Sequence, residues 1–282
     1  MQEVRARLAA YNDDETRLLS EVLPQVATQL RGSLANIYSV MSSIVPPDSR
    51  DANGSLDQNA AILYQSYYRI LRVINNLSVT PELLQTAPLP MQNLDLVDLV
   101  SGLCGEARPL AEELGLALHF QSSQPSHLLA CNRAGIRRLL LNLLSNAMKF
   151  TPAGGSITVL IQFTAEQAVL TVTDTGCGIA PELQDAVFDR YKHTDRQDPE
   201  PHGLGLGLPI CRRIAEGHGG RLMLQSQPAQ GTTVTVSLPD RRCPSHMVVK
   251  DLPFHYAGGF NETLLELSDA LRHSSFTQKN LD

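Results

Sequence analysis

The sequence predicts an α+β fold in which a helical hairpin is followed by an α/β sandwich. Between residues 56 and 77, apolar side chains recur at alternating steps of four and three residues, which is the pattern of a coiled-coil seam. Residues 156–164 instead alternate apolar and mostly polar side chains, as a half-buried strand does. The length of 282 residues is enough for one sizeable core and a smaller module.

The composition excludes several classes of function. The net charge of −6 and the lack of Lys or Arg runs predict no nucleic-acid surface. No apolar stretch approaches the roughly 18 residues of a membrane span, and the first residues lack the apolar core of a signal peptide. The five cysteines are widely scattered, without the spacing of metal or redox sites. We therefore expect a cytoplasmic protein with reduced thiols and no membrane span.

The N-terminal part of the chain is predicted to be a helical hairpin. Apolar residues keep a helical rhythm from Glu15 to Val45, Pro46-Pro47 end it, and 48–55 is expected to be a turn-rich loop. The coiled-coil seam then defines the second helix. Because the seam of one hairpin is too exposed on its own, two hairpins are expected to pair as a four-helix bundle. This predicts a homodimer through residues 15–80.

A helix with a polar face is expected at 133–148, where apolar residues recur at three- and four-residue spacing and Asn132 precedes them as an N-cap. On the opposite face, Asn142, Asn146 and Lys149 fall within about 60° of one another. Amide oxygens one turn apart suit a hard cation such as Mg²⁺, and a lysine suits phosphate. The alternative is an ordinary solvated face.

The second polar segment follows a predicted strand. Alternation along this strand places Asp174 on the inward side with Leu170 and Val172, where a carboxylate is costly unless it meets a donor. Gly176 and Gly178 follow at once and allow the backbone to approach a flat ligand closely. An adenine amino group is a natural partner for this carboxylate. The alternative is an aspartate that only initiates a turn before two glycines.

The third segment, Gly203-Leu204-Gly205-Leu206-Gly207, follows a polar run over 193–202. It is not a Rossmann turn, which needs a strand just before it, and it lacks the Gly-Lys-Ser/Thr ending of a P-loop. A helix follows, with Pro209 acceptable in its first turn. A glycine hinge that opens a helix offers free N–H groups to phosphate, so we interpret the polar run as a lid over a nucleotide.

In this order and with these gaps, the three segments resemble the N, G1 and G2 boxes of the Bergerat-type (GHKL) ATP-binding fold, and most closely the catalytic domain of sensor histidine kinases. The resemblance implies ATP and Mg²⁺ as cofactors, with Asn146 on the metal and Lys149 on phosphate. Phe150 would flank the base, and Asp174 would bind the adenine amino group. The resemblance also implies ATP contacts for Asn142, Gly176, Gly178, Ile179, Arg190, Tyr191, Gly203, Leu204, Gly205, Leu206, Gly207 and Thr233.

Two positions bear on the reaction. Hydrolytic relatives that resemble gyrase place a glutamate where Asn142 stands, and because an amide cannot activate water, phosphoryl transfer is favoured over hydrolysis. The phosphoacceptor histidine of the kinases is replaced by Thr28, and no histidine precedes His119. No catalytic residue is assigned, because a threonine ester is a poor phosphoryl donor and the neighbouring Gln29 cannot take a proton.

Three functions remain open. The first is a histidine kinase of two-component signalling, or a phosphorelay, that transfers the γ-phosphoryl group of ATP to protein. The second is an inactive ATP-binding pseudokinase that scaffolds a response regulator or another kinase. The third is a serine kinase similar to anti-sigma kinases, which would not need the hairpin. The expected domains are an N-terminal extension (1–14), a hairpin dimerisation domain (15–80), a linker (81–91), an ATP-binding catalytic domain (92–240) and a C-terminal tail with a short helix (241–282).

Overall fold

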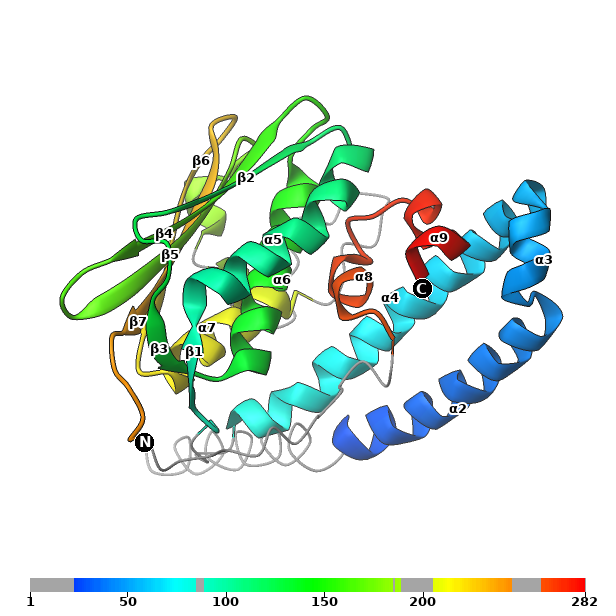
Figure 1. The fold of residues 1–282 in the computed structure, drawn as a ribbon, viewed down its shortest axis with the longest axis horizontal. Helices are drawn as coiled ribbons and strands as arrows, with labels where there is room; N and C mark the ends of the chain where they lie inside the picture. Colours follow the sequence, from blue (N-terminus) through cyan, green and yellow to red (C-terminus); the bar gives the residue numbers. More distant parts are fainter. Residues whose placement is uncertain (1–22, 85–88, 185, 189–204, 245–259, 282) are drawn as a thin grey trace, which may run out of the picture.

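The structure is a computed structural model that describes residues 23–84, 89–184, 186–188, 205–244 and 260–281. Long helices form one side of the molecule, and a sheet covered by shorter helices forms the other (Figure 1). The predicted α+β fold, with a helical N-terminal part and an α/β sandwich, is therefore confirmed. None of the described helices combines the length and the apolar character needed to cross a membrane.

The hairpin consists of α2 (Leu23–Ile44) and α4 (Gly54–Leu84), which lie side by side (Figure 1). The expected loop at 48–55 is wrong, because most of it belongs to a short helix, α3 (Pro47–Ala52). Proline at the first helical position has its φ already set for a helix. The acidic Asp48 in the first turn stabilises the helix through its interaction with the positive end of the helix dipole. Helix α4 also continues beyond the expected domain boundary at 80, to Leu84.

The main sheet has five strands in the order β2-β4-β5-β7-β6. Strands β2 (Ala117–Ser122) and β4 (Ser156–Phe163) are parallel, whereas all other neighbours are antiparallel. The predicted strand at 156–164 is confirmed by β4. The remaining strands are β5 (Gln167–Asp174), β6 (Arg221–Gln227) and β7 (Gly231–Pro239), and a separate antiparallel pair is formed by β1 (Gln92–Asp95) and β3 (Leu128–Cys131).

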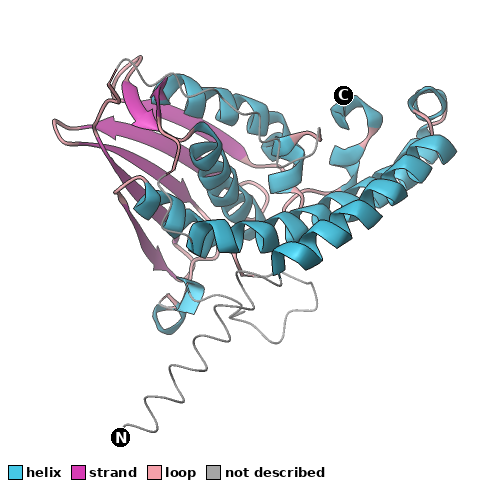
Figure 2. Ribbon diagram, turned by 90° about the horizontal axis from the view of Figure 1, so that it is seen from below, coloured by secondary structure: helices cyan, strands magenta, loops and turns pink. Residues whose placement is uncertain are grey.

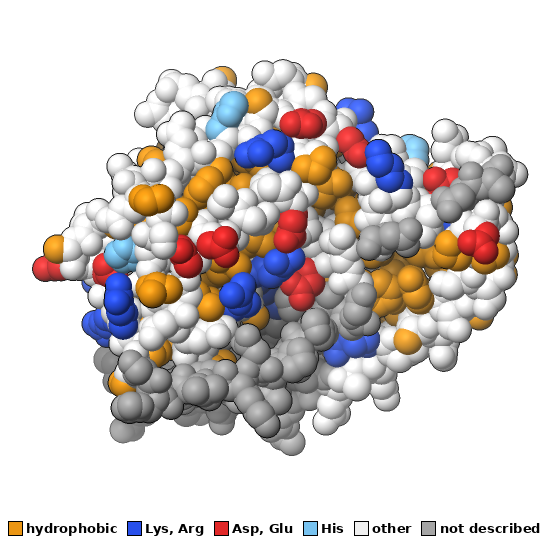
Figure 3. All heavy atoms as spheres, in the orientation of Figure 1, with side chains coloured by type: hydrophobic (Ala, Val, Ile, Leu, Met, Phe, Trp, Pro, Cys, Tyr) orange, Lys and Arg blue, Asp and Glu red, His pale blue; other side chains and the backbone are white. Residues whose placement is uncertain are grey.

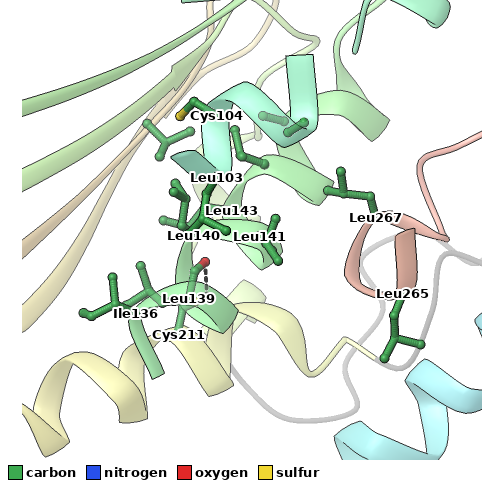
Figure 4. Close-up of a cluster of buried hydrophobic side chains, with 14 of the residues drawn as sticks. Leu103, Cys104, Ile136, Leu139, Leu140, Leu141, Leu143, Cys211, Leu265 and Leu267 are labelled. Atoms are coloured by element: carbon green, nitrogen blue, oxygen red, sulfur yellow. Dashed lines mark hydrogen bonds between the residues drawn. The ribbon is translucent and has the colours of Figure 1, made fainter. Parts of the chain in front are cut away.

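Three helices cover one face of the sheet: α5 (Leu96–Glu113), α6 (Arg133–Phe150) and α7 (Gly207–Gly217) (Figure 2). The apolar side of α6 forms the centre of the core, where Leu139, Leu140 and Leu143 are all buried (Figure 4). The Cys211 thiol of α7 donates a hydrogen bond to the Leu139 carbonyl oxygen, at 3.5 Å. Two 3₁₀ turns, η2 (Pro181–Leu183) and η3 (Ala186–Phe188), follow the end of β5.

The C-terminal segment, residues 260–281, lies between the hairpin and the sandwich (Figure 1). The sequence predicts one short helix there but does not identify the surface on which it docks. In the structure the segment contains the short helix α8 (Glu262–Leu267), followed by a 3₁₀ turn η4 (His273–Phe276) and a second short helix α9 (Gln278–Leu281). Asn261 caps α8 by accepting a hydrogen bond from the Leu264 N–H at 3.0 Å. Its apolar side chains are buried against α4 and α6.

Candidate functional site

The start of α6 is fixed by two polar side chains. Asn132 is the predicted N-cap, and its Oδ1 accepts a hydrogen bond from the Gly135 N–H at 2.7 Å. The N–H of Asn132 in turn donates to Nε2 of His218, at 3.0 Å, while Nδ1 of His218 lies 2.7 Å from the Ile214 carbonyl. Burial lowers the pKa of His218, so the ring is neutral and uses one nitrogen as donor and one as acceptor. His218 therefore orients α6 and is not a metal ligand.

Asp174, at the end of β5, lies on the inward side of the sheet with the buried Leu170 and Val172, as the sequence predicts. Its Oδ1 accepts hydrogen bonds from the N–H groups of Gly176 (2.8 Å) and Thr232 (3.2 Å). Burial raises the pKa of Asp174, and these two hydrogen bonds oppose the rise. Within the described part of the chain, Oδ2 accepts no hydrogen bond, so this oxygen is left for an external donor.

The loop after Asp174 is tied to α6 and to β6. The Cys177 N–H donates to the Phe150 carbonyl oxygen at 3.1 Å, which joins this loop to the last residue of α6. The Ile179 N–H donates to Ser226 Oγ on β6, at 2.8 Å. Gly178 has a φ of +69°, and a Cβ there would collide with the Gln227 carbonyl oxygen. Only glycine therefore fits this position, which holds the loop beside the end of α6.

The predicted lid, 193–202, lies outside the described residues, but the start of α7, which follows it, lies directly over the polar side chains of α6. A Cβ built on Gly207, the first residue of α7, would be 3.2 Å from Asn142 Oδ1 and 3.9 Å from Asn146 Nδ2. The first and third segments are thus brought together, although about 60 residues separate them. Gly205 and Leu206 precede α7 within the described chain. Arg190, Tyr191, Gly203 and Leu204 lie outside the described residues.

Thr233 does not join this group. Strand β7 buries Val234 and Val236 toward the helices, so Thr233 lies on the opposite face of the sheet from Asp174. There its Oγ1 lies 3.2 Å from Thr173 Oγ1. The residue opposite Asp174 is Thr232. Counting back in steps of two from Val234 and Val236 places Thr232, and not Thr233, on the inward face of the strand.

Asn142 is the residue whose surroundings differ most from the expectation of an open polar face, because only 1% of it is exposed. Its Nδ2 donates to the Arg138 carbonyl oxygen at 2.9 Å and to Glu266 Oε2 at 3.2 Å. Its Oδ1 accepts a hydrogen bond from Arg72 Nη2 at 3.2 Å. The hairpin and the C-terminal segment therefore cover this turn of α6. Sequence reasoning missed Arg72 and Glu266, because they are 70 and 124 residues away and carry no motif.

The other two residues of the predicted polar face of α6 remain accessible. Asn146 and Lys149 are half-buried, and the side chain of Phe150 is 45% exposed. The Lys149 ammonium lies 5.4 Å from the centre of the Phe150 ring. No group of three or more His, Cys, Asp or Glu side chains that suits a metal ion occurs among the described residues. An amide oxygen is a suitable ligand for Mg²⁺, which commonly takes its other oxygen ligands from phosphate and water.

Comparisons with known proteins find similar domains. Residues 131–242 match the family model described as "Histidine kinase-, DNA gyrase B-, and HSP90-like ATPase". The adaptive-response sensory kinase SasA of Rippkaea orientalis is 30% identical over 225 residues. The match covers 77% of this chain and 57% of SasA, so the chain spans little more than half of that relative.

Two solved structures share the fold at low sequence identity. Full-length ShkA in complex with AMPPNP has a TM-score of 0.65 and 22% identity, over 80% of this chain and 47% of ShkA. The histidine kinase ThkA in complex with the response regulator TrrA has a TM-score of 0.55 and 17% identity, over 83% of this chain and 67% of that one. In both cases the similarity extends from the sandwich into the helical part of the molecule.

Proposed function

We propose that this chain, in which residues 131–242 form a domain of the histidine kinase-, DNA gyrase B- and HSP90-like ATPase family, binds ATP with Mg²⁺ in two-component signalling. The main support is the convergence of three distant segments: the Asp174 carboxylate, the amide of Asn146 and the start of α7 at Gly207. Each supplies a group that suits a different part of ATP: a carboxylate for the adenine amino group, an amide for the cation and backbone N–H groups for phosphate.

The proposed roles follow from these positions. Asp174 Oδ2 accepts a hydrogen bond from the adenine amino group, while its Oδ1 is already held by two backbone N–H groups. The exposed ring of Phe150 packs against the base, and Lys149 binds phosphate. Asn146 ligates Mg²⁺, which neutralises phosphate charge when it is bound. Arg190, Tyr191 and the segment from Gly203 to Gly207 are proposed to close over the nucleotide.

The proposed reaction is transfer of the γ-phosphoryl group to a nucleophile on protein, with ADP as the leaving group. Thr28 lies on an exposed part of α2, where the resembling kinases carry histidine. The same residue favours the alternative, an ATP-binding pseudokinase that scaffolds a response regulator or another kinase. Asn142 supports either function over hydrolysis, because an amide cannot remove a proton from water.

A homodimer through residues 15–80 is also proposed. The predicted seam of α4 is divided in the structure, because Tyr67 and Ile74 are buried whereas Leu63 and Ile70 are half exposed. On α2, Ile37, Val40 and Ile44 each expose half or more of the side chain. Figure 3 shows exposed hydrophobic side chains in the region of these helices. Pairing two hairpins would bury this surface, as in a four-helix bundle.

Two measurements test the proposed function. Calorimetry with ATP and Mg²⁺ tests binding, and the absence of any heat of binding would refute both the kinase and the scaffold. Incubation with γ-labelled ATP tests transfer: acid-labile protein label indicates phosphohistidine, and acid-stable label indicates Ser or Thr. ATP binding without label supports the scaffold.

A further inference from the structure

The C-terminal segment, residues 260–281, is held on α4 by side chains that bind its backbone. Three residues of α4 or the preceding helix donate to carbonyl oxygens of the segment: Arg50 to Phe276 (3.0 Å), Gln65 to Leu271 (2.7 Å) and Arg69 to Ser268 (3.2 Å). These contacts repeat along the length of the segment, so it docks in a defined register.

Aromatic packing and ion pairs attach the segment to both parts of the molecule. Phe260 packs against Tyr38 and Tyr67 of the hairpin, with ring centres 4.6 and 5.3 Å apart. On the sandwich side, Glu262 forms a 2.6 Å ion pair with Arg137 of α6. Ser275 Oγ donates to Glu113 of α5, at 2.6 Å. The segment therefore joins the hairpin to the ATP-binding domain.

At the centre of this junction is Glu266, whose side chain is completely buried. Its Oε2 lies 3.2 Å from Asn142 Nδ2 and 3.4 Å from Arg72 Nε, and its Oε1 lies 3.8 Å from Arg138 Nε. A buried carboxylate is stable only when cations and hydrogen-bond donors compensate its charge. Arg72, Arg138 and Asn142 thus make an anion-binding site, to which the hairpin and α6 both contribute.

The carboxylate does not use all the donors of this site. Glu266 Oε1 and Arg72 Nε are buried and have no hydrogen-bond partner within the described chain, although both are within ion-pair distance of an opposite charge. The position of the carboxylate therefore leaves the Arg72 Nε–H unused, and a phosphate oxygen placed differently would accept a hydrogen bond from it. A phosphate group has three such oxygens and pairs well with guanidinium groups.

The position of this site identifies the competing anion. Asn142 belongs to the site, and it is also one turn from Asn146 and in contact range of the start of α7, where phosphate is proposed to bind. We propose that this site takes the terminal phosphate of ATP, and that in this structure Glu266 occupies it as a built-in competitor carried by residues 260–281. The inference rests on the proposed ATP binding and adds to it the residues Arg72 and Arg138 and a means of control.

Competition of this kind has a quantitative consequence. When a segment blocks a site, the apparent dissociation constant equals the intrinsic one divided by the fraction of molecules that are open. If the segment is docked in about nine molecules of ten, the apparent affinity for ATP falls about tenfold. Because ADP lacks the terminal phosphate, its affinity is reduced less. Saturating ATP with Mg²⁺ in turn displaces the segment, because the coupling is reciprocal.

The test compares full-length variants by calorimetry with Mg²⁺ and either ATP or ADP. Glu266→Gln removes the competing charge and is expected to raise the affinity for ATP about tenfold, with a smaller change in the affinity for ADP. Lys279→Gln, on the exposed side of the same segment, is the matched control and is expected to change neither affinity. Adding Arg72→Gln to Glu266→Gln is expected to weaken ATP again, because Arg72 then contacts phosphate.

A second variant covers the case in which Glu266→Gln does not fold. Arg69→Gln weakens the docking of the segment at a point outside the anion site, since Arg69 binds only the Ser268 carbonyl in the described contacts. This variant is also expected to raise the affinity for ATP. Hydrogen exchange on the unaltered chain provides an independent readout: the amides of α8 are expected to exchange faster when ATP and Mg²⁺ are added.

The outcomes separate this inference from the proposed function. Equal ATP affinity in all these variants, or α8 protection that does not change with saturating ATP, overturns the competition but leaves ATP binding intact. Failure of every variant to bind any nucleotide overturns both. A gain of ATP affinity with Arg72→Gln in the Glu266→Gln background supports a blocking segment but overturns the phosphate role of Arg72.

Discussion

The two ends of the proposed ATP site are built in different ways. The adenine end, around Asp174, is assembled within the sandwich by β5, β7 and the loop that follows β5, and one carboxylate oxygen is left for a ligand. The phosphate end, around Asn142, is assembled from α6, α4 and α8, and its polar groups are already paired with one another. The adenine end is thus ready to bind, whereas the phosphate end must first exchange partners. Control of the protein is expected at the phosphate end.

The largest expected effect concerns the charge pair at the phosphate end. Arg72→Met leaves the buried Glu266 carboxylate without its nearest cation, and removing one partner of a buried pair costs about 3–5 kcal/mol of unfolding free energy. Urea unfolding measures this loss. The double variant Arg72→Met with Glu266→Leu removes the uncompensated buried carboxylate and is expected to recover part of the stability, because Arg138 then loses its carboxylate partner and Asp269 its ion pair with Arg72.

This first prediction fails if the single and double variants are equally unstable, because the loss then comes from packing and not from an unpaired charge. Arg69→Met is the matched control, since Arg69 is exposed and binds a carbonyl oxygen of the same segment. It is expected to cost no more than about 1.5 kcal/mol, as for one hydrogen bond.

The second prediction tests the adenine end. Asp174→Asn keeps Oδ1 for the Gly176 and Thr232 N–H groups but places an NH₂ group where the adenine amino group donates. An unpaired contact of this kind costs about 1–3 kcal/mol, which is about a 5- to 150-fold loss of ATP affinity in calorimetry. Glu182→Gln, an exposed acid in the following turn, serves as the control. Unchanged ATP affinity in Asp174→Asn would show that this carboxylate does not bind adenine.

The same contrast explains what the sequence predicts and what it does not. Asp174 follows from strand alternation, because its partners lie within a few residues or on a neighbouring strand. The hairpin follows from helical periodicity in the same way. Arg72 and Glu266 are not predictable, because burial of a charge depends on which distant segments meet, and no local pattern records that. Thr233 is a different case, because the alternation of β7 is a local pattern that places Thr232, and not Thr233, on the face of Asp174.

The third prediction concerns pH and the start of α6. The pKa of His218 is lowered by burial, so the folded state favours the neutral ring, and its contribution is complete above the unfolded pKa of about 6.5 and lost as pH falls through the folded pKa. Protonation removes the acceptor for the Asn132 N–H, a loss of about 0.5–1.5 kcal/mol. The melting temperature is therefore expected to fall more steeply below pH 6.5 in the unaltered chain than in His218→Gln. His273→Gln, at an exposed site, is expected to keep the steep profile.

The smallest expected effect compares the two threonines beside Asp174. Thr233→Val removes a hydroxyl on the outer face of the sheet, where its partner is Thr173, so ATP affinity is expected to change less than about twofold, or 0.4 kcal/mol. Thr232→Val removes a hydroxyl that lies 2.9 Å from Ser226 Oγ, the group that accepts from the Ile179 N–H. Loss of that contact loosens the loop after Asp174, and we expect ATP to bind a few-fold more weakly. The two variants are isosteric and adjacent, so calorimetry on the pair separates the two faces of β7. If Thr233→Val were the weaker binder, the nucleotide would lie on the outer face of the sheet, and the adenine end would have to be rebuilt around Thr173.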